Sequence, residues 1–408
     1  MHRSLTLVFA LAAFIASPSL GTAQTLPEVV IPLPAPTGRF PVGTAVAYLT
    51  ESTRRDTDFA AGRPITVQLW YPVTAVSDTH APYLFEKELG ATLVRTDYYG
   101  IDTIALAAWA HLTTHSIIGA PVASGSHPII TFSVGAGVAR ANYTSIAEEL
   151  ASHGFIVVLV ESPLAGFMMR PNGQLITDTT EHYGTPIAHR AGVAAWSRDV
   201  SFALDQLHAH SVSPIFTRVA STVDWSRIGA AGHSSGGLVA IATCETDSRV
   251  RACVNLDGGM ASPQQEPMAD FVAKGTTKPT LLLRSKPLYS EADFARRGLT
   301  REQWEKRGEG GRIALDSVIA RARGPLWMGF VAGTGHMSFS DAPFVMPSTI
   351  SRFGGTIIDA RRGLLVITTA IRAFFDQEFD HKRDDLVNLS ARLPEVTIVR
   401  THPAAVSP

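Results

Sequence analysis

Short apolar runs alternate with amphipathic stretches along most of this chain of 408 residues. Each run spans four to seven residues, and such runs are typical of strands buried on both faces of a sheet. They predict strands at residues 44–49, 65–71, 129–132, 155–160, 228–231, 250–256, 280–284 and 326–331. The stretches with apolar positions at helical spacing predict helices at residues 104–115, 142–152, 191–208 and 361–379.

The order of these elements indicates the fold class. Strands that alternate with helices form parallel sheets, because each helix carries the chain back across one face. We therefore expect an α/β fold with a mostly parallel central sheet, helices on both faces and a helical insertion. The insertion is residues 289–323, which are charged and helix-prone, and which we interpret as an added segment or the flank of a lid. Residues 81–126 are mixed in character and are a candidate cover for an active site.

The beginning of the chain is typical of an export signal. His2 and Arg3 give a positive start, residues 5–15 are apolar, and Gly21-Thr22-Ala23 offers a small-residue cleavage site. We predict a signal peptide at residues 1–23, with an uncleaved anchor as the alternative, and hence a secreted or periplasmic protein. After cleavage we expect no integral membrane segment.

The rest of the chain divides into three parts. Residues 24–41 are rich in proline and predict an extended lead-in. Residues 42–380 hold all the predicted elements and form the α/β domain, and residues 381–408 are expected to be a C-terminal tail.

Composition narrows the function classes. Hydrophobic residues make up 45% of the chain and charged residues 17%, which is typical of a globular protein. The formal net charge is −1 and there is no basic block, which argues against nucleic-acid binding as the main role. Cys244 and Cys253 either pair in an exported protein or are buried thiols, and both alternatives stay open. Their spacing lacks further metal ligands, so we predict no metal site and no cofactor.

The clearest chemical signal is Gly232-His233-Ser234-Ser235-Gly236. It follows a predicted strand and precedes the apolar stretch 237–242, so it reads as strand, sharp turn and helix. That context is the one a nucleophile elbow needs, because the turn holds the serine hydroxyl out at the start of a helix. We predict that Ser234 is a nucleophile and that His233 packs beside the strand.

A serine hydroxyl needs a base to take its proton. His336 follows the strand at residues 326–331 within a glycine-rich loop, and is the best candidate. His381 and His402 also lie downstream, but neither follows a strand.

The base in turn needs an acid that fixes its tautomer. Asp257 ends the strand at residues 250–256 and is the preferred candidate. Glu291 and Asp293, which follow the next strand, remain the alternatives.

An oxyanion hole needs two preorganised N–H donors. We expect one from the amide of Ser235, directly after the nucleophile, and one from the amide of Ala136 in the loop after the strand at residues 129–132. Small or apolar residues near these positions predict a substrate pocket for neutral esters with short to medium acyl chains. They are Val134, Val138, Met260, Met337 and Phe339.

With these residues in place, the chain resembles the plasma-type platelet-activating-factor acetylhydrolases and their bacterial relatives, within the α/β-hydrolase superfamily. The resemblance covers residues 65–379 and rests on short motifs spread along that range. The motifs are Trp70-Tyr71-Pro72, residues 128–137 (PIITFSVGAG), residues 149–161 (ELASHGFIVVLVE), Arg198-Asp199-Val200, Ala203-Leu204-Asp205, the elbow at 232–236, Asn255-Leu256-Asp257-Gly258 and residues 336–341 (HMSFSD).

The resemblance implies an α/β-hydrolase domain with Ser234 as nucleophile, Asp257 as acid and His336 as base. It also implies oxyanion amides at Ser235 and Ala136, and it favours Asp257 over the two alternative acids. The chain departs from the family at Val134, where a histidine is usual, and in the length of the insertion at 289–323.

The sequence therefore predicts a serine hydrolase whose partner is a small-molecule ester. The alternatives of the same fold are a lactonase, a polyester hydrolase and an acyl-amide hydrolase. The alternative of another class is a non-catalytic binding protein on a hydrolase fold. Neither the leaving group nor the oligomeric state follows from the sequence.

Overall fold

The computed structural model of the protein describes residues 30–55, 59–74, 77, 79–86, 89–90, 93, 103–176, 185–261, 266–352, 358–380 and 386–402. The predicted signal peptide at 1–23 and the histidine at position 381 lie outside these residues. None of the described helices is both long enough and apolar enough to cross a bilayer.

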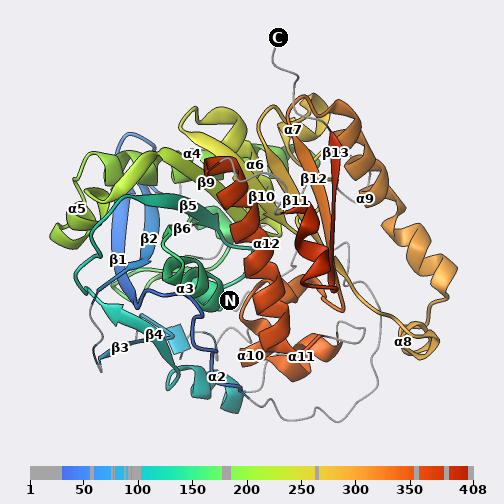
Figure 1. Ribbon diagram of the computed structural model, residues 1–408, viewed down its shortest axis with the longest axis horizontal. Coiled ribbons are helices and arrows are strands. Elements are labelled where there is room, and N and C mark those ends of the chain that lie inside the picture. Colours follow the sequence, from blue (N-terminus) through green and yellow to red (C-terminus); the bar gives the residue numbers. More distant parts are fainter. Residues whose placement is uncertain are drawn as a thin grey trace, which may run out of the picture.

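Eleven strands form the main sheet of the described chain (Figure 1). In chain order they are β1 (Val42–Glu51), β2 (Arg63–Pro72), β3 (His80–Pro82), β4 (Thr113–Ile118), β5 (His127–Ser133), β6 (Ile156–Glu161), β9 (Val223–His233), β10 (Val250–Leu256), β11 (Thr280–Lys286), β12 (Leu326–Ala332) and β13 (Val396–His402). Across the sheet the order is β13-β12-β11-β10-β9-β5-β6-β2-β1-β4-β3. A separate hairpin joins β7 (Met168–Met169) and β8 (Leu175–Ile176).

The six strands from β6 to β12 in that order are all parallel to their neighbours. Antiparallel pairs lie outside them, between β2 and β6, β1 and β2, β3 and β4, and β12 and β13. Every residue of β2 and β6 is buried, as expected for strands covered on both faces. The prediction of a mostly parallel sheet is confirmed.

Helices cover both faces of this sheet (Figure 1). On one face α3 (Thr144–Ser152) packs beside α12 (Ala360–Asp380), and on the other α4 (Pro186–His208) packs beside α6 (Ser235–Thr246). The remaining helices are α2 (Thr103–Trp109), α5 (Pro214–Ala220), α7 (Asp270–Lys274), α8 (Glu291–Arg296), α9 (Arg301–Arg321), α10 (Ala342–Val345) and α11 (Pro347–Arg352). The described residues also form four short 3-10 turns: η2 (Arg140–Tyr143), η3 (Pro163–Ala165), η5 (His336–Phe339) and η6 (Val387–Ala391).

The extended lead-in is fixed to the body of the domain. The Thr37 amide donates to the Glu149 carboxylate over 2.7 Å, and the Phe40 amide donates to the Ser152 carbonyl over 3.0 Å. Both acceptors lie on α3, so the lead-in follows that helix before it enters β1.

Two predictions at the edges of the sheet were wrong. The helix expected at 104–115 ends at Trp109, because residues 113–118 form β4, which pairs with β1 and β3. The expected tail at 381–408 contains β13, which pairs antiparallel with β12. The stretch from Val396 to Thr401 is rich in β-branched residues, and it buries Val396 and Ile398 against the core.

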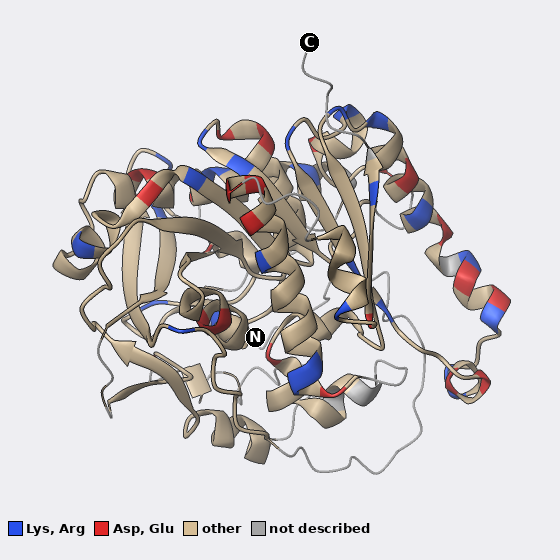
Figure 2. Ribbon diagram, viewed as in Figure 1, with Lys and Arg blue, Asp and Glu red and all other residues tan. Residues whose placement is uncertain are grey.

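The insertion at 289–323 is helical, as predicted. Its second helix, α9, buries Ala314 and Val318 near its end, where it packs on α7. The first half of α9 extends away from the body, and charged residues of both signs alternate along it (Figures 1 and 2). The role of this segment as a lid flank stays a prediction.

The two cysteines are free and buried. The Cys253 thiol lies 3.3 Å from the Thr280 hydroxyl, within the core. The disulfide alternative is therefore wrong, and both side chains act as small apolar residues, as the other alternative expected.

Buried carboxyl groups are a second feature of the core. Glu148 of α3 accepts hydrogen bonds from the His115 amide at 2.8 Å and the Ser116 hydroxyl at 2.6 Å. Burial nevertheless raises its pKa to about 7, since these two bonds only partly replace the lost water. Burial raises the pKa of Glu161 and of Asp341 to about 7 as well.

We expect these groups to make the protein more stable at mildly acidic pH than at mildly alkaline pH. The unfolded chain releases the protons of the two glutamates near pH 4.5 and that of Asp341 near pH 3.8, whereas the folded chain holds all three to about pH 7. The free energy of unfolding should therefore fall as pH rises across this window. Urea unfolding at pH 5.5 and pH 8 measures it, and Glu148→Gln, which cannot ionise, should weaken the fall. Equal falls in the variant and the wild type would contradict this assignment for Glu148.

Candidate active site

The predicted nucleophile occupies a strained turn between β9 and α6. Ser234 has φ 57° and ψ −126°, a conformation that non-glycine residues rarely adopt. Its neighbours Gly232 and Gly236 permit the turn. A Cβ on Gly232 would overlap the Gly236 carbonyl, and a Cβ on Gly236 would overlap the Ser133 carbonyl. Side chains at either position would force the helix away from β5 and β9.

The structure brings the three predicted catalytic residues together. The His336 Nε2 atom lies 3.0 Å from the Ser234 hydroxyl oxygen, and its Nδ1 atom lies 2.8 Å from the Asp257 carboxylate. Each residue follows a strand: Ser234 follows β9, Asp257 follows β10, and His336 begins η5 after β12. Since these strands are parallel, their carboxyl ends lie along one edge of the sheet.

Asp257 is held in its ionised form by several donors. Its carboxylate accepts from the Ser285 amide at 3.0 Å and from the Ser285 hydroxyl at 2.9 Å, and Arg284 lies 3.5 Å away. Burial alone would raise the pKa of Asp257, but Arg284 and the bond to His336 outweigh it and hold that pKa well below its usual range. The carboxylate can therefore orient His336 without taking its proton.

The alternative acids lie elsewhere. Glu291 forms an exposed ion pair with Arg301, and Asp293 closes a capping box with Ser290 at the start of α8. His402 lies in β13, at the opposite end of β12 from His336, where it pairs with Leu326. Of the candidate acids, only Asp257 contacts His336 among the described residues.

The predicted oxyanion donors lie at the start of α6 and in the loop after β5. Ala136 lies in the loop after β5, and Ser235 is the first residue of α6. Both are half-buried, and within the described chain neither amide has an acceptor. The neighbouring amides are used: the Gly137 amide donates to the Ala165 carbonyl at 2.6 Å, and the Gly135 amide donates to the Tyr143 hydroxyl at 2.7 Å. The loop thus leaves the Ala136 N–H available to a bound group.

The sequence matches one family over most of its length. The family described as platelet-activating factor acetylhydrolase, isoform II, matches residues 28–163 and 210–391. This chain belongs to the platelet-activating factor acetylhydrolase, isoform II, family. A second family, described as chlorophyllase, matches residues 96–260.

Individual relatives agree with this assignment. A probable 1-alkyl-2-acetylglycerophosphocholine esterase from Arthroderma benhamiae is 24% identical, over 92% of this chain and 96% of its own length. A platelet-activating factor acetylhydrolase from Bos taurus is 25% identical, over 54% of this chain and 54% of its own length.

Among solved structures, a ferulic acid esterase from Streptomyces cinnamoneus superposes with a TM-score of 0.68 at 27% identity. It covers 91% of this chain and 100% of that one. The fold is therefore that of an α/β-hydrolase, as predicted, and the chain is a hydrolase of the esterase and acetylhydrolase group.

The structure buries most of the residues that were predicted to line the substrate pocket. Four of its five residues are buried in the hydrophobic core and reach no solvent: Val134, Val138, Met260 and Phe339. They belong to the hydrophobic core that packs around the central sheet. Met337, next to the base, is half-buried and is the one predicted pocket residue that a substrate can reach.

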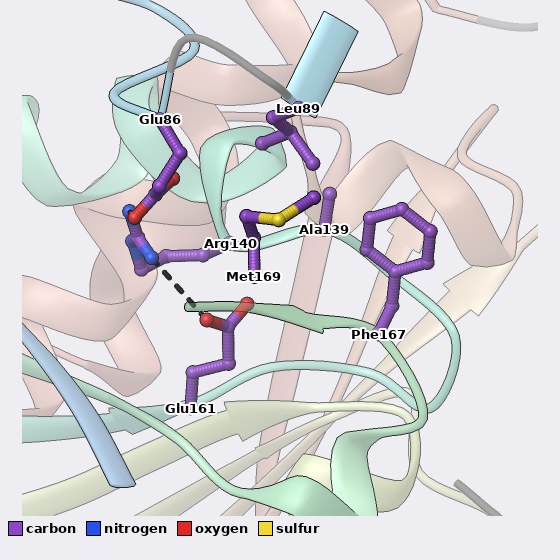
Figure 3. Close-up of a pocket in the computed structure, with 7 residues that line it drawn as sticks. All are labelled: Glu86, Leu89, Ala139, Arg140, Glu161, Phe167 and Met169. Carbon is purple, nitrogen blue, oxygen red and sulfur yellow. Dashed lines mark hydrogen bonds and ion pairs between the residues drawn. The ribbon is translucent and has the colours of Figure 1, made fainter. Parts of the chain in front are cut away.

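A small cavity lies beside Ala139 and Arg140 (Figure 3). Leu89, Ala139, Phe167 and Met169 form its apolar wall, and it has room for about one water molecule. Its polar side is an ionic cluster in which Arg140 lies 2.7 Å from Glu86 and 3.2 Å from Glu161 (Figure 3). The cluster ties η2, which carries Arg140, to β6, which carries Glu161.

Sequence reasoning missed the residues that support the triad. Arg284 ends the predicted strand at 280–284 and Ser285 follows it, and this polar pair at a strand end was the available signal. Tyr143, which contacts both Gly135 and His233, carries no local motif that would have marked it.

We expect Asp257→Asn to lower kcat on the order of 10⁴-fold, because an amide favours the wrong tautomer of His336. The matched control is Asp293→Asn, which also removes a carboxylate bonded to a serine and an arginine but lies in a helix cap. Steady-state hydrolysis of a nitrophenyl ester measures both. A large loss in the control with little loss in Asp257→Asn would move the acid to α8.

Proposed function

We propose that this protein is an exported serine hydrolase that cleaves carboxylic esters through an acyl-enzyme. The observation that carries the proposal is the continuous hydrogen-bonded line from Ser234 through His336 to Asp257, with distances of 3.0 and 2.8 Å. Export rests on the sequence of residues 1–23.

In the first half-reaction the Ser234 oxygen attacks the ester carbonyl while His336 Nε2 takes the hydroxyl proton. The carbonyl oxygen becomes an oxyanion, which the amides of Ala136 and Ser235 stabilise. The tetrahedral intermediate collapses when His336 returns the proton to the leaving alcohol, which leaves an ester on Ser234. Water then repeats the sequence: His336 takes its proton, the acid product forms, and Ser234 regains its own proton.

Asp257 stays ionised throughout the cycle. Burial raises the pKa of Asp257, but the nearby charge of Arg284 is the largest single effect that lowers it, and the carboxylate is ionised. The carboxylate therefore stays an acceptor for the Nδ1–H of His336. It thereby stabilises the imidazolium that forms in each half-reaction. No step of this cycle requires a metal ion or an organic cofactor.

The substrates we propose are neutral esters with short to medium acyl chains. Arg284 cannot seize an anionic head group, since its guanidinium donates to the Gly258 carbonyl at 2.6 Å and lies against Asp257. The half-buried Met337 offers apolar contact beside the base. The names of the relatives add two ester types to test, an acetylated glycerophosphocholine and a ferulic ester.

The first test concerns the nucleophile. Ser234→Ala should lower kcat on the order of 10⁴- to 10⁶-fold and abolish labelling by a fluorophosphonate probe. Ser235→Ala is the matched control from the same turn; it keeps its backbone amide and should stay within about tenfold of wild type. A wild-type protein that is folded and yet unlabelled would favour a non-catalytic binding protein. Labelling that persists in Ser234→Ala would move the nucleophile elsewhere.

The second test concerns the substrate. We expect kcat/KM for nitrophenyl esters to be highest for short and medium chains and to fall toward palmitate. Each added methylene of the acyl chain contributes only about 1 kcal/mol or less to the binding free energy. The shape of the pocket must therefore limit the length of the acyl chain. Acetyl-glycerophosphocholine, a feruloyl ester, a lactone, an anilide and polyester film complete the panel. A steady rise to palmitate would contradict this prediction and indicate an open lipase groove.

A further inference from the structure

Behind the catalytic line lies a second hydrogen-bonded line that uses two fully buried rings. His233, the residue before the nucleophile, is 0% exposed, and Tyr143 of η2 is 1% exposed. The Tyr143 hydroxyl lies 2.7 Å from the Gly135 amide nitrogen and 2.9 Å from His233 Nδ1. His233 Nε2 lies 2.9 Å from the backbone carbonyl oxygen of His336. The second line therefore begins in the oxyanion loop and ends on the backbone of the base.

The chemistry of the end groups fixes the direction of every bond in this line. A carbonyl oxygen only accepts, so His233 Nε2 must carry a proton and donate to His336. Burial, together with the nearby His336, lowers the pKa of His233 to about 3, so its ring is neutral and has a single N–H. Its Nδ1 atom is then an acceptor, and the Tyr143 hydroxyl donates to it. The Gly135 amide only donates, and it fills a lone pair of the same hydroxyl.

The second line contacts the backbone or side chain of residues at, or directly before, the proposed catalytic residues. Gly135 precedes Ala136, His233 precedes Ser234, and the third contact is on His336 itself. The rings of His233 and His336 also lie against each other, with centroids 4.6 Å apart. A shift of any of the three backbone segments therefore stretches at least one of these three hydrogen bonds.

We propose that Tyr143 and His233 are positioning residues for ester hydrolysis, which hold the oxyanion loop and the base in register with each other. The proposal rests on the proposed function. It assigns neither residue a contact with the substrate or a part in proton transfer. Their effect is to keep the Ala136 amide and the His336 ring at fixed places relative to Ser234, so that both act on one tetrahedral intermediate.

Tyr143→Phe tests this directly, because it removes only the hydroxyl and keeps the ring that packs on Phe132, 5.2 Å away between centroids. The matched control is Tyr71→Phe in β2, which also deletes a buried hydroxyl. The Tyr71 hydroxyl donates to the Ala120 carbonyl over 3.0 Å. Three quantities are measured for each protein: kcat and KM for nitrophenyl butyrate, the inhibition constant of a trifluoromethyl ketone that adds to the serine, and the urea midpoint.

We expect Tyr143→Phe to lower kcat about 10- to 100-fold and to change KM less than about threefold. This loss in kcat is smaller than the loss that follows removal of an oxyanion donor itself. Affinity for the trifluoromethyl ketone should fall in parallel, because that adduct carries the oxyanion. Tyr71→Phe should lose stability but keep its kcat and its affinity for the ketone. Equal kinetics in the two folded variants would overturn the positioning role.

His233 supplies a second test that does not depend on how Tyr143→Phe folds. His233→Gln keeps an N–H that can reach the His336 carbonyl, whereas His233→Leu keeps none. Higher kcat in the glutamine variant at a similar urea midpoint supports the proposal, and equal kcat in both overturns it. A wild type that neither hydrolyses esters nor reacts with a fluorophosphonate would instead overturn the proposed function, so the two failures are distinguishable.

Discussion

The site depends on one steric constraint, the close approach of the turn after β9 to the end of β5. Gly236 lies against the Ser133 carbonyl so closely that no side chain fits between them. This contact places the first amide of α6 beside the loop that carries Ala136. The two proposed oxyanion donors, about 100 residues apart in the sequence, therefore lie on segments that pack against each other. Strain in the serine backbone, with φ at 57°, accompanies this geometry.

Much of the fold and the core of the candidate site could be predicted from the sequence. Buried parallel strands have continuous apolar sequences, so the sequence predicts five strands close to their observed ranges. These are β5, β6, β10, β11 and β12. The parallel order then places the residues that follow those strands along one edge. The elbow motif, the positions of Asp257 and His336 after strands, and the family resemblance together predict these residues and Ser234 as a triad. The structure brings both Ser234 and Asp257 within hydrogen-bond reach of His336.

What the sequence could not give depends on packing between distant segments. Apolar residues near the site looked like pocket walls, but Val134 and Phe339 turn inward, and only the folded backbone decides that direction. Tyr143 contacts His233, 90 residues later, and no local pattern encodes such a pair. The end of the chain was missed for another reason: β13 is a single strand that follows a long polar stretch, and its partner β12 is about 70 residues earlier.

Strand β13 makes β12, the strand that leads to the base, an interior strand of the sheet and not an edge strand. With β13 paired along its side, β12 has neighbours on both edges, so its N–H and C=O groups are not offered to other molecules. The outermost position falls instead to a segment whose exposed side chains include Arg400 and Val399. A charged side chain on an outer strand discourages the edge-to-edge association that open sheets invite. Within the described chain, β13 thus moves the open edge of the sheet from the strand before the base to a strand that carries an exposed arginine.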